Sequence, residues 1–370
     1  MTRLVDTPAV PTALPPAGVE LIDAIDRARL VGRGGASFPV ATKWRAVAQR
    51  SRGDAVILVN GAEGEPQSKK DRHLMTARPH AILDGAFLAA RVLRARRIVL
   101  YIGERHEQAR DAMLGALADR GEPERSFVKL AAAPARYVAG AEAAAIHLVN
   151  DGIATPTNVP PYPFARGVGG APTLVQNVET LAHVAQIARG DFANTMLVTL
   201  TGTVERRGVL EVARGTTVAD AIAYAGGSRE APRAVLVGGY FGAWIEADAA
   251  LRLPLDNRTQ MGCGVIGVLG ESHCPVCEVA EIMRYLAGES SAQCGPCFFG
   301  LRALADACTR IAEGGSNSED LQRLHRWASE IRGRGACKHP DGASIFLASA
   351  LRVFAAEFAQ HRAHATRRTA

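Results

Sequence analysis

The chain is poor in aromatic residues and has no cysteine before Cys263. Phe, Trp and Tyr make up 5% of the 370 residues, which is too little for a surface that stacks on nucleic-acid bases. No zinc-finger, RRM or helix-turn-helix pattern is present either, so nucleic-acid binding is not expected. The longest apolar stretches are interrupted by charge, as at Asp84, and none supplies the roughly 20 apolar residues of a membrane helix. Direct membrane insertion is therefore not expected.

The two common nucleotide-binding fingerprints do not describe the glycine-rich segment Gly32–Trp44. Three glycines in four residues are followed there by Lys43, but the spacing is not G-x-G-x-x-G. The sequence has no G-x-x-x-x-G-K-S/T loop either. Closely spaced glycines let backbone N–H groups approach a ligand, and a lysine adds positive charge, so this segment predicts a phosphate cradle of another kind.

All seven cysteines lie in the last third of the chain. Residues 1–18 contain four prolines and no apolar run of the signal-peptide type, so we expect a cytoplasmic protein. Cysteines in that compartment favour metal or cluster binding over a disulfide scaffold. The best candidates are Cys294 and Cys297, spaced C-x-x-C, together with Cys337.

Two other interpretations of the cysteines remain open. A thioredoxin-type redox pair normally follows a strand, whereas the surroundings of Cys294 have helical spacing. Cys274 and Cys277 form a second C-x-x-C, and the two pairs together have the spacing of a zinc ribbon. Cys308 lies on an apolar helical stripe and is expected in the core.

The charge balance is positive, since 43 Lys and Arg residues face 37 Asp and Glu residues, for a net charge of +6. With nucleic acid disfavoured, an acidic protein partner is the expected counterpart. The basic residues of the C-terminal tail are expected to be solvated rather than part of a site.

Apolar patterning predicts an α/β protein with three regions. Strands at 55–60 and 97–103 flank a helix at 79–93, as in a parallel sheet buried on both faces. A hairpin at 196–204 and 208–212, a helix at 216–225 and a strand at 234–238 form a small ββαβ unit. Four amphipathic segments then predict a helical bundle.

Three polar or rigid segments have a structural as well as a functional interpretation. Asn60–Pro66 follows the first strand, and its glutamates could bind ribose hydroxyls or form a solvated acidic turn. Pro160–Pro163 could present Tyr162 to a planar ligand or act as a stiff connection. Gln176–Thr180 could bond the edge of a ring, or Asn177 could cap a helix.

Together these segments resemble the NADH-binding flavoprotein subunit of respiratory complex I, the 51 kDa-like family, and its relatives in NAD-dependent hydrogenases and formate dehydrogenases. The family pattern G-R-G-G-A-G-F-P-x-G-x-K-W is matched by Gly32–Trp44, and N-A-D-E-G-E-P-x-x-x-K-D-R by Asn60–Arg72. Y-x-x-G-E-E-T-A-L is matched by Tyr137–Ala145, and the P-P-F-P segment by Pro160–Leu181. The S-C-G-x-C-x-P-C cluster segment is matched in part by Ser290–Cys297.

The resemblance implies an FMN-binding α/β domain, a small β-grasp-like (SLBB-type) domain and a C-terminal helical bundle that holds a 4Fe–4S cluster. The expected boundaries are a flexible N-terminus at 1–18, the FMN and NAD(P)H domain at 19–193 and the β-grasp-like domain at 194–262. The bundle is expected at 263–360 and a basic tail at 361–370.

The resemblance also implies residue roles. Four residues of the glycine loop would hold the FMN phosphate region: Gly32, Gly34, Gly35 and Lys43. Five would line the flavin: Asn60, Glu63, Gly140, Asn177 and Thr180. Four would face the nicotinamide nucleotide: Glu65, Phe38, Tyr162 and Glu142, of which Glu142 would shape nicotinamide approach as the catalytic residue. The cluster ligands would be Cys294, Cys297 and Cys337. Because the first cysteine of the motif is replaced, Ser291 could be the fourth ligand, Cys274 could be recruited instead, or the cluster could be a three-iron form or missing.

The chain departs from the family pattern at several positions. Ala62 replaces Asp, Lys69 replaces Phe, Ala141 replaces Glu, Gln176 replaces Asn and Ser291 replaces Cys. Some segments also resemble the C subunit of the Rnf complex, a more distant relative, but the paired cluster motifs of that subunit are absent. These departures indicate a divergent, stand-alone branch.

The sequence therefore predicts an FMN-dependent NAD(P)H:acceptor oxidoreductase that passes electrons through a 4Fe–4S cluster to an acidic protein, either a ferredoxin or a 2Fe–2S subunit. The alternatives are a scaffold subunit with a degraded nucleotide site and a zinc-binding C-terminal module.

Overall fold

The computed structural model describes residues 3–7, 10, 13–256, 259, 261–315 and 318–361. Of the predicted basic tail only His361 is among them, and residues 1, 2, 8, 9, 11 and 12 of the predicted flexible N-terminus lie outside them. The chain divides into two compact units, one of residues 1–199, 208–216 and 254–264 and one of residues 200–207, 217–253 and 265–370. No helix in the described ranges is long and apolar enough to cross a membrane.

The first unit is built on a parallel sheet. Its described strands are β1 (Ala55–Gly61), β2 (Ala95–Gly103), β3 (Val128–Ala133) and β4 (Thr173–Asn177), in the order β3-β2-β1-β4. All three pairings are parallel. The predictions at 55–60 and 97–103 are confirmed, whereas β3 and β4 were not predicted. β4 continues directly into a helix. Its last two residues, Gln176 and Asn177, belong to the Gln176–Thr180 segment that was expected at the start of that helix.

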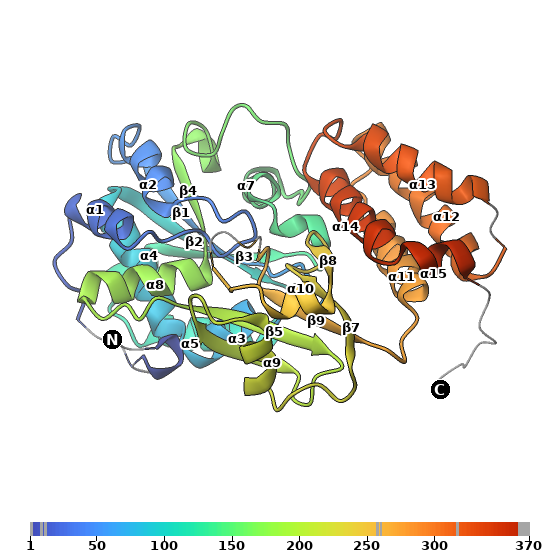
Figure 1. Ribbon diagram of the computed structural model, residues 1–370. Coiled ribbons are helices and arrows are strands. Elements are labelled where there is room, and N and C mark those ends of the chain that lie inside the picture. Colours follow the sequence, from blue (N-terminus) through green and yellow to red (C-terminus); the bar gives the residue numbers. More distant parts are fainter. Residues whose placement is uncertain are drawn as a thin grey trace. The chain divides into compact units, whose positions relative to one another are not determined.

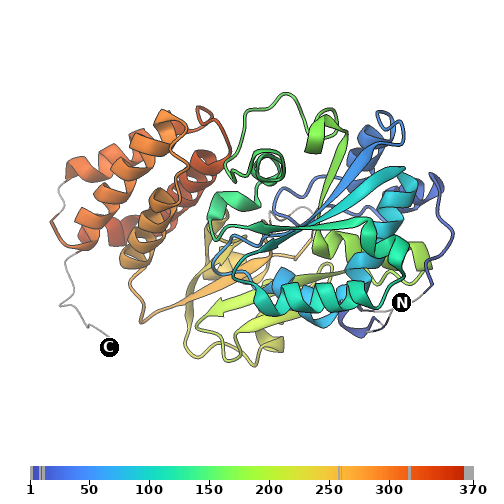
Figure 2. The ribbon, with the colours of Figure 1, turned by 180° about the vertical axis from the view of Figure 1, so that it is seen from behind.

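Both faces of this sheet are buried. Ile57 and Val59 of β1 join one hydrophobic cluster, while the alternate residues Val56 and Leu58 join another on the opposite face. This explains why β1 has a continuous apolar sequence instead of an alternating one. Figure 1 shows α4 (Pro79–Val92) and α8 (Val178–Arg189), which contact each other, over the first face. The helix α5 (Glu107–Ala118), which the view from behind in Figure 2 shows, contacts β2 and joins the same cluster as Ile57.

The helices of this unit follow the predicted α/β alternation. They are α1 (Glu20–Arg27), α2 (Val40–Ala48), α3 (Lys70–Ala77), α4 (Pro79–Val92), α5 (Glu107–Ala118), α6 (Glu122–Ser126), α7 (Glu142–Asp151) and α8 (Val178–Arg189). α4 approaches α8 closely at Gly85, where an added Cβ would lie 1.9 Å from the Leu181 carbonyl oxygen. Only glycine permits this approach.

A second sheet contains β5 (Thr195–Gly202), β6 (Gly208–Ala213), β7 (Pro232–Val237), β8 (Ala243–Glu246) and β9 (Val265–Gly270), in the order β6-β5-β9-β7-β8. β7 pairs antiparallel with β8 and β9. The helices of this region are α9 (Val218–Tyr224) and α10 (Ala247–Leu251). The predicted ββαβ unit is thus present with two further strands. β9 corrects the expected bundle boundary at 263, because Val265–Gly270 pairs with this sheet.

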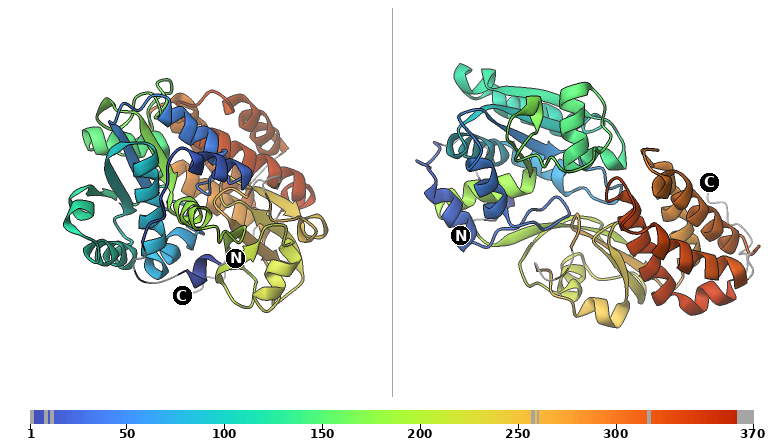
Figure 3. Two further views of the ribbon diagram at one scale, coloured as in Figure 1. Left: turned by 90° about the vertical axis from the view of Figure 1, so that its left-hand side faces the viewer. Right: turned by 90° about the horizontal axis from the view of Figure 1, so that it is seen from above.

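The C-terminal region is helical, as predicted. It contains α11 (Pro275–Gly288), α12 (Leu301–Ala312), α13 (Ser318–Ile331), α14 (His339–Val353) and α15 (Ala355–Gln360). The first four helices contact one another as a closed ring of neighbours, which the right-hand view of Figure 3 shows. Cys308 is fully buried on α12, which confirms its expected core position. The last of the four predicted amphipathic segments, with Leu347, Leu351, Phe354 and Phe358 at helical spacing, contains two helices, because α14 ends at Val353 and α15 begins at Ala355.

Candidate functional site

The glycine segment forms a closed loop between α1 and α2. Val31 bridges Pro39, and the Gly32 N–H donates to the Phe38 carbonyl over 2.8 Å. Gly35 has a φ of 114°, a conformation that side-chain-bearing residues rarely adopt. The Arg33 N–H donates to the Thr180 hydroxyl over 2.9 Å and fixes the loop to α8. The loop therefore has a defined shape at the carboxyl edge of the parallel sheet.

A small cavity of about 70 Å³ lies between this loop and the ends of β1 and β4. Eight of the predicted site residues line it: Gly32, Gly34, Phe38, Lys43, Asn60, Gly140, Glu142 and Asn177. Asn60 and Asn177 are register partners in the β1–β4 pair, so two strand ends present an amide at adjacent positions. Ligands of open parallel sheets bind at this edge, so the location agrees with a binding site.

Lys43 and Glu142 form an ion pair in the wall of this cavity. Lys43 Nζ contacts the Glu142 carboxylate and also donates to the Val175 carbonyl over 2.9 Å. The Glu142 side chain is 44% exposed and begins α7, whereas Lys43 is 20% exposed. An anion that enters the cavity would compete with Glu142 for the same ammonium group. Binding of a phosphate and the position of Glu142 are therefore linked.

The two amides have protein partners of their own. Asn60 Nδ2 donates to the Gly140 carbonyl over 2.9 Å, which holds the Tyr137–Gly140 turn against β1. Asn177 Oδ1 accepts from the Glu179 N–H over 3.0 Å and so caps α8, as the structural interpretation of this segment predicted. Its Nδ2 donates to Asp71 over 2.7 Å. Asn177 thus combines a capping role with a place in the cavity wall.

Five predicted residues are not among those lining the cavity: Gly35, Glu63, Glu65, Tyr162 and Thr180. Glu63 is buried against the first turn of α3, where it accepts from the Asp71 N–H over 2.8 Å and from Arg72 Nε over 2.9 Å. Although burial raises the pKa of Glu63, Arg72 and the backbone donor bring it below its ordinary value overall. Glu63 thus stabilises the turn after β1.

Glu65 also has an internal role. It accepts from the Tyr137 hydroxyl over 3.1 Å, which joins the turn after β1 to the segment before α7. The close approach needs Gly64, since a Cβ there would lie 2.7 Å from the Tyr137 carbonyl oxygen. Tyr162 is 51% exposed and stacks on Phe164 with ring centroids 5.5 Å apart. It lies on the Pro160–Pro163 segment, part of which lines a separate cavity of about 530 Å³ beside α7.

A group of buried charges lies beneath the loop, and the sequence patterns did not indicate it. Glu179 is fully buried, accepts from Arg33 Nε over 3.1 Å and pairs with Lys70 Nζ at 2.9 Å. Lys70, 1% exposed, also pairs with Asp71 at 2.6 Å. Burial raises the pKa of Asp71 to about 6, partly offset by Lys70. Lys70–Arg72 belong to the family motif and carry three of the charges in this region. Glu179, the partner of Lys70, lies more than a hundred residues away in the sequence, so the pairing could not be inferred from the motif.

The three predicted cluster cysteines lie together in the second unit. Cys297 is buried in a π-helical turn at Pro296–Gly300, and Cys297 and Cys294 both act electrostatically on Cys337. Burial raises the pKa of Cys297, and hydrogen bonds from the Ser290 side chain and from the backbone of Ser291 and Ala292 oppose this only in part. A raised pKa is the opposite of what a thioredoxin-type nucleophile needs.

Ser291 and Cys274 have different neighbours. The Ser291 residue is half-buried, and its hydroxyl donates to Gln293 Oε1 over 3.1 Å, within the same loop as Cys294. Cys274 Sγ instead lies 3.9 Å from His361 Nδ1 and accepts from the Cys277 N–H over 3.4 Å. The two C-x-x-C segments therefore have separate partners, which disfavours the zinc-ribbon pairing.

Three known families match the chain in order. The Nuo51 FMN-binding domain matches residues 25–186, the SLBB domain 197–239 and the NADH-ubiquinone oxidoreductase-F iron-sulfur binding region 278–361. An F subunit of NADH-quinone oxidoreductase from Rhizobium meliloti is 29% identical over 373 residues, covering 92% of this chain and 88% of the relative. The F subunit of the same enzyme from Mycobacterium tuberculosis is also 29% identical, covering 92% of this chain and 84% of the relative.

The chain is therefore similar, over 92% of its length, to an F subunit of NADH-quinone oxidoreductase, and it carries the FMN-binding, SLBB and iron-sulfur regions in that order. A chain of an NAD+-reducing NiFe-hydrogenase, solved in the H2-reduced state, matches with a TM-score of 0.83 and 30% identity. The match covers 94% of this chain and 63% of the hydrogenase chain, so this chain spans less than two thirds of that relative. The family supplies FMN and a 4Fe–4S cluster as cofactors and NADH as substrate.

The residues of the cavity fit a flavin nucleotide. Gln176 lines it, and its Oε1 atom is buried without a hydrogen-bond partner among the described residues. An unpaired buried acceptor is costly, and an N–H on the edge of a flavin ring would satisfy it. Gly34 leaves room beside Asn177, whose Cβ would lie 3.5 Å from a Cβ added to the glycine. Gln176 is one of the departures from the family pattern, and it keeps an amide at this position.

The cysteine group fits an iron–sulfur cluster. Cys294 and Cys297 both act electrostatically on Cys337, and hydrogen bonds to the sulfur of Cys297 are of the kind that stabilise cluster and thiolate sulfur. Ser291 occupies the position of the first cysteine of the family motif. The chain is thus an NADH dehydrogenase-like flavoprotein.

Proposed function

We propose that this chain is an NADH:acceptor oxidoreductase that passes electrons from FMN, through a 4Fe–4S cluster held by Cys294, Cys297, Cys337 and Ser291, to an acidic electron-transfer protein. The observation that carries the proposal is the cavity at the carboxyl edge of the parallel sheet, where the glycine loop, Lys43 and Glu142 meet. When bound, FMN accepts an electron pair from NADH as a hydride and releases single electrons, which the cluster conducts.

The protein's own contribution is binding and orientation. The glycine loop offers backbone N–H groups, and Lys43 offers the positive charge that a flavin phosphate requires. Glu142, displaced from Lys43 by that phosphate, is then available at the cavity mouth to influence how the nicotinamide approaches. Asn60 and Gly140 keep the α7 segment against the sheet, so that Glu142 and the glycine loop face each other.

Anaerobic reconstitution tests the proposal directly. Protein loaded with FMN is expected to lose its flavin absorbance when NADH is added, and to regain it with an added electron acceptor. The spectrum is recorded under argon, with flavin-free buffer as blank. A flavin that binds but stays oxidised in excess NADH would contradict the proposed activity.

Lys43→Ala is expected to weaken FMN binding about 10–100-fold, since a charge-assisted hydrogen bond contributes about 1.5–3 kcal/mol. Riboflavin, which has no phosphate, is expected to bind both proteins equally. Isothermal titration with both flavins measures the difference. Arg45→Ala is the matched control, because Arg45 lies on the same helix but pairs with Asp23 and Asp26 at the surface. Equal weakening of FMN and riboflavin binding would contradict a phosphate role for Lys43.

The acidic acceptor follows from the net charge of +6. Opposite charges accelerate encounter, and salt screens them. Turnover with a low-potential ferredoxin as the acceptor is expected to fall about tenfold in kcat/KM between low and high ionic strength. Turnover with a small uncharged quinone should change little. A salt-independent rate with ferredoxin would argue against electrostatic docking of an acidic partner.

A further inference from the structure

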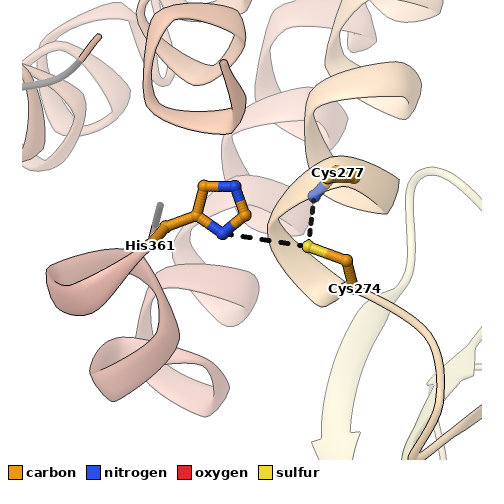
Figure 4. A group of neighbouring side chains, drawn as sticks. All are labelled: Cys274, Cys277 and His361. Atoms are coloured by element: carbon orange, nitrogen blue, oxygen red, sulfur yellow. Dashed lines mark hydrogen bonds between the residues drawn. The ribbon is translucent and has the colours of Figure 1, made fainter. Parts of the chain in front are cut away.

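Two cysteines and a histidine meet at one end of the helical bundle, away from the residues assigned to the cluster. Cys274 caps α11, Cys277 lies in its first turn, and His361 directly follows α15 (Figure 4). Their ligand atoms all lie within 4.8 Å of one another. The cysteines and the histidine come from opposite ends of the C-terminal helical region, so this is a tertiary arrangement and not a local turn.

The orientation of His361 is set by a backbone carbonyl. Its Nε2 lies 3.0 Å from the oxygen of Ala312, the last residue of α12. A carbonyl can only accept, so Nε2 carries the proton and Nδ1 of the neutral ring carries the lone pair. Nδ1 is the atom that faces Cys274 Sγ, 3.9 Å away. Histidines that bind metals commonly donate their second N–H to a carbonyl in this way.

The spacing agrees with a tetrahedral zinc site. Zinc–sulfur and zinc–nitrogen bonds of about 2.3 and 2.0–2.1 Å place sulfur and nitrogen ligands about 3.6 Å apart in a tetrahedron. The observed 3.9 Å separation is close to that value. The Cys277 N–H donates to Cys274 Sγ over 3.4 Å, which favours a thiolate at this sulfur. Two thiolates and an imidazole form a donor set that zinc prefers.

We propose that Cys274, Cys277 and His361 bind a zinc ion. Within the described residues three side chains converge, so water would complete the tetrahedron. Because zinc has no redox chemistry, the ion would join the ends of α11, α12 and α15 without entering electron transfer. Cys274 and Cys277 both precede the matched iron–sulfur region, which begins at residue 278. The proposal depends on neither the flavin nor the acceptor.

The test is the metal content of the full-length protein, purified anaerobically with its cluster and equilibrated with a slight excess of zinc. Elemental analysis is expected to find about one tightly bound zinc per chain in addition to iron. Cys274→Ser and His361→Ala should each lose the zinc while iron per FMN stays unchanged. The controls are Cys263→Ser, outside the bundle, and His325→Ala, exposed on α13. Both should keep zinc.

Cobalt binding supplies a measurement that needs no variant. Zinc-depleted protein titrated with Co²⁺ should develop thiolate-to-metal charge-transfer bands and the visible bands of a tetrahedral ion. If zinc-depleted wild-type protein develops none of these bands with Co²⁺, the proposal is overturned. The contact between Cys274 and His361 would then be only a thiol–imidazole hydrogen bond. Zinc retained in Cys274→Ser, or lost in Cys294→Ser, would overturn it as well, because the metal would then occupy the cluster position. Loss of iron in Cys274→Ser would overturn it by showing that Cys274 is a cluster ligand instead.

Discussion

Glu179→Ala is expected to lower the free energy of unfolding by about 3–5 kcal/mol and to abolish FMN binding, although residue 179 does not line the cavity. The substitution leaves Lys70 and Arg33, 1% and 6% exposed, without the carboxylate that lies between them. Arg33 then loses the carboxylate that it pairs with, and Lys70 keeps only Asp71. Removing one partner of a buried ion pair costs far more than the intact pair contributes.

The effect on FMN follows from the geometry of the loop. Arg33 is part of the glycine segment. Its side chain donates to Glu179, and its backbone N–H donates to the hydroxyl of Thr180, the next residue of α8. Glu179 also accepts from the Leu197 N–H over 2.9 Å, so the same carboxylate fixes the start of β5. Its loss is expected to release both segments and to deform the cradle.

Chemical denaturation of the apoprotein, with hydrogen exchange followed over β4 and α8, measures the loss. Glu142→Gln is the matched control, because its ion pair with Lys43 is partly exposed and such pairs contribute about 0–1 kcal/mol. Glu179→Gln keeps an acceptor for Leu197 but not the charge, and should fall between the two. A Glu179→Ala protein within about 1 kcal/mol of wild type would show that the buried charges are solvated or paired elsewhere.

Which features the sequence could predict depends on how local their causes are. The glycine loop was recognisable because closely spaced glycines and a following lysine are adjacent in the chain. β1 was recognisable because both of its faces are buried. β3 escaped prediction because it is an edge strand whose Lys129 and Leu130 are exposed. β4 escaped because α8 follows it without a break at Asn177.

The same distinction applies to the site. Glu63 and Glu65 were expected at the ligand because acidic residues on a glycine-rich turn suggest ribose binding. In the structure these carboxylates accept hydrogen bonds from α3 and Tyr137, which no spacing rule could have indicated. Their contact with a bound nucleotide stays a prediction. His361 was placed in a solvated tail, and only its distance to Cys274 gives it another role.

Ser291 decides whether the cluster of this chain has three or four protein ligands. It occupies the position of the first cysteine in the family motif, three residues before Cys294. Ser291→Ala is expected to lose cluster iron or to retain only a three-iron form, because a methyl group cannot coordinate metal. Ser291→Cys restores four thiolates and should hold the full cluster with a changed reduction potential, since ligand type tunes the potential.

Iron and acid-labile sulfide per FMN, together with the EPR spectrum after dithionite reduction, separate these outcomes. Ser290→Ala is the neighbouring control, because Ser290 donates to the Cys297 sulfur without occupying a ligand position of the family motif. The Ser290→Ala protein should keep all its iron. Only the reduction potential of the cluster should shift, because hydrogen bonds to a ligand sulfur tune that potential. If Ser291→Ala retained wild-type iron content and an unchanged EPR spectrum, the hydroxyl would not be the fourth ligand. The cluster would then have an iron coordinated by solvent, and its exposed position would become the expected exit for electrons.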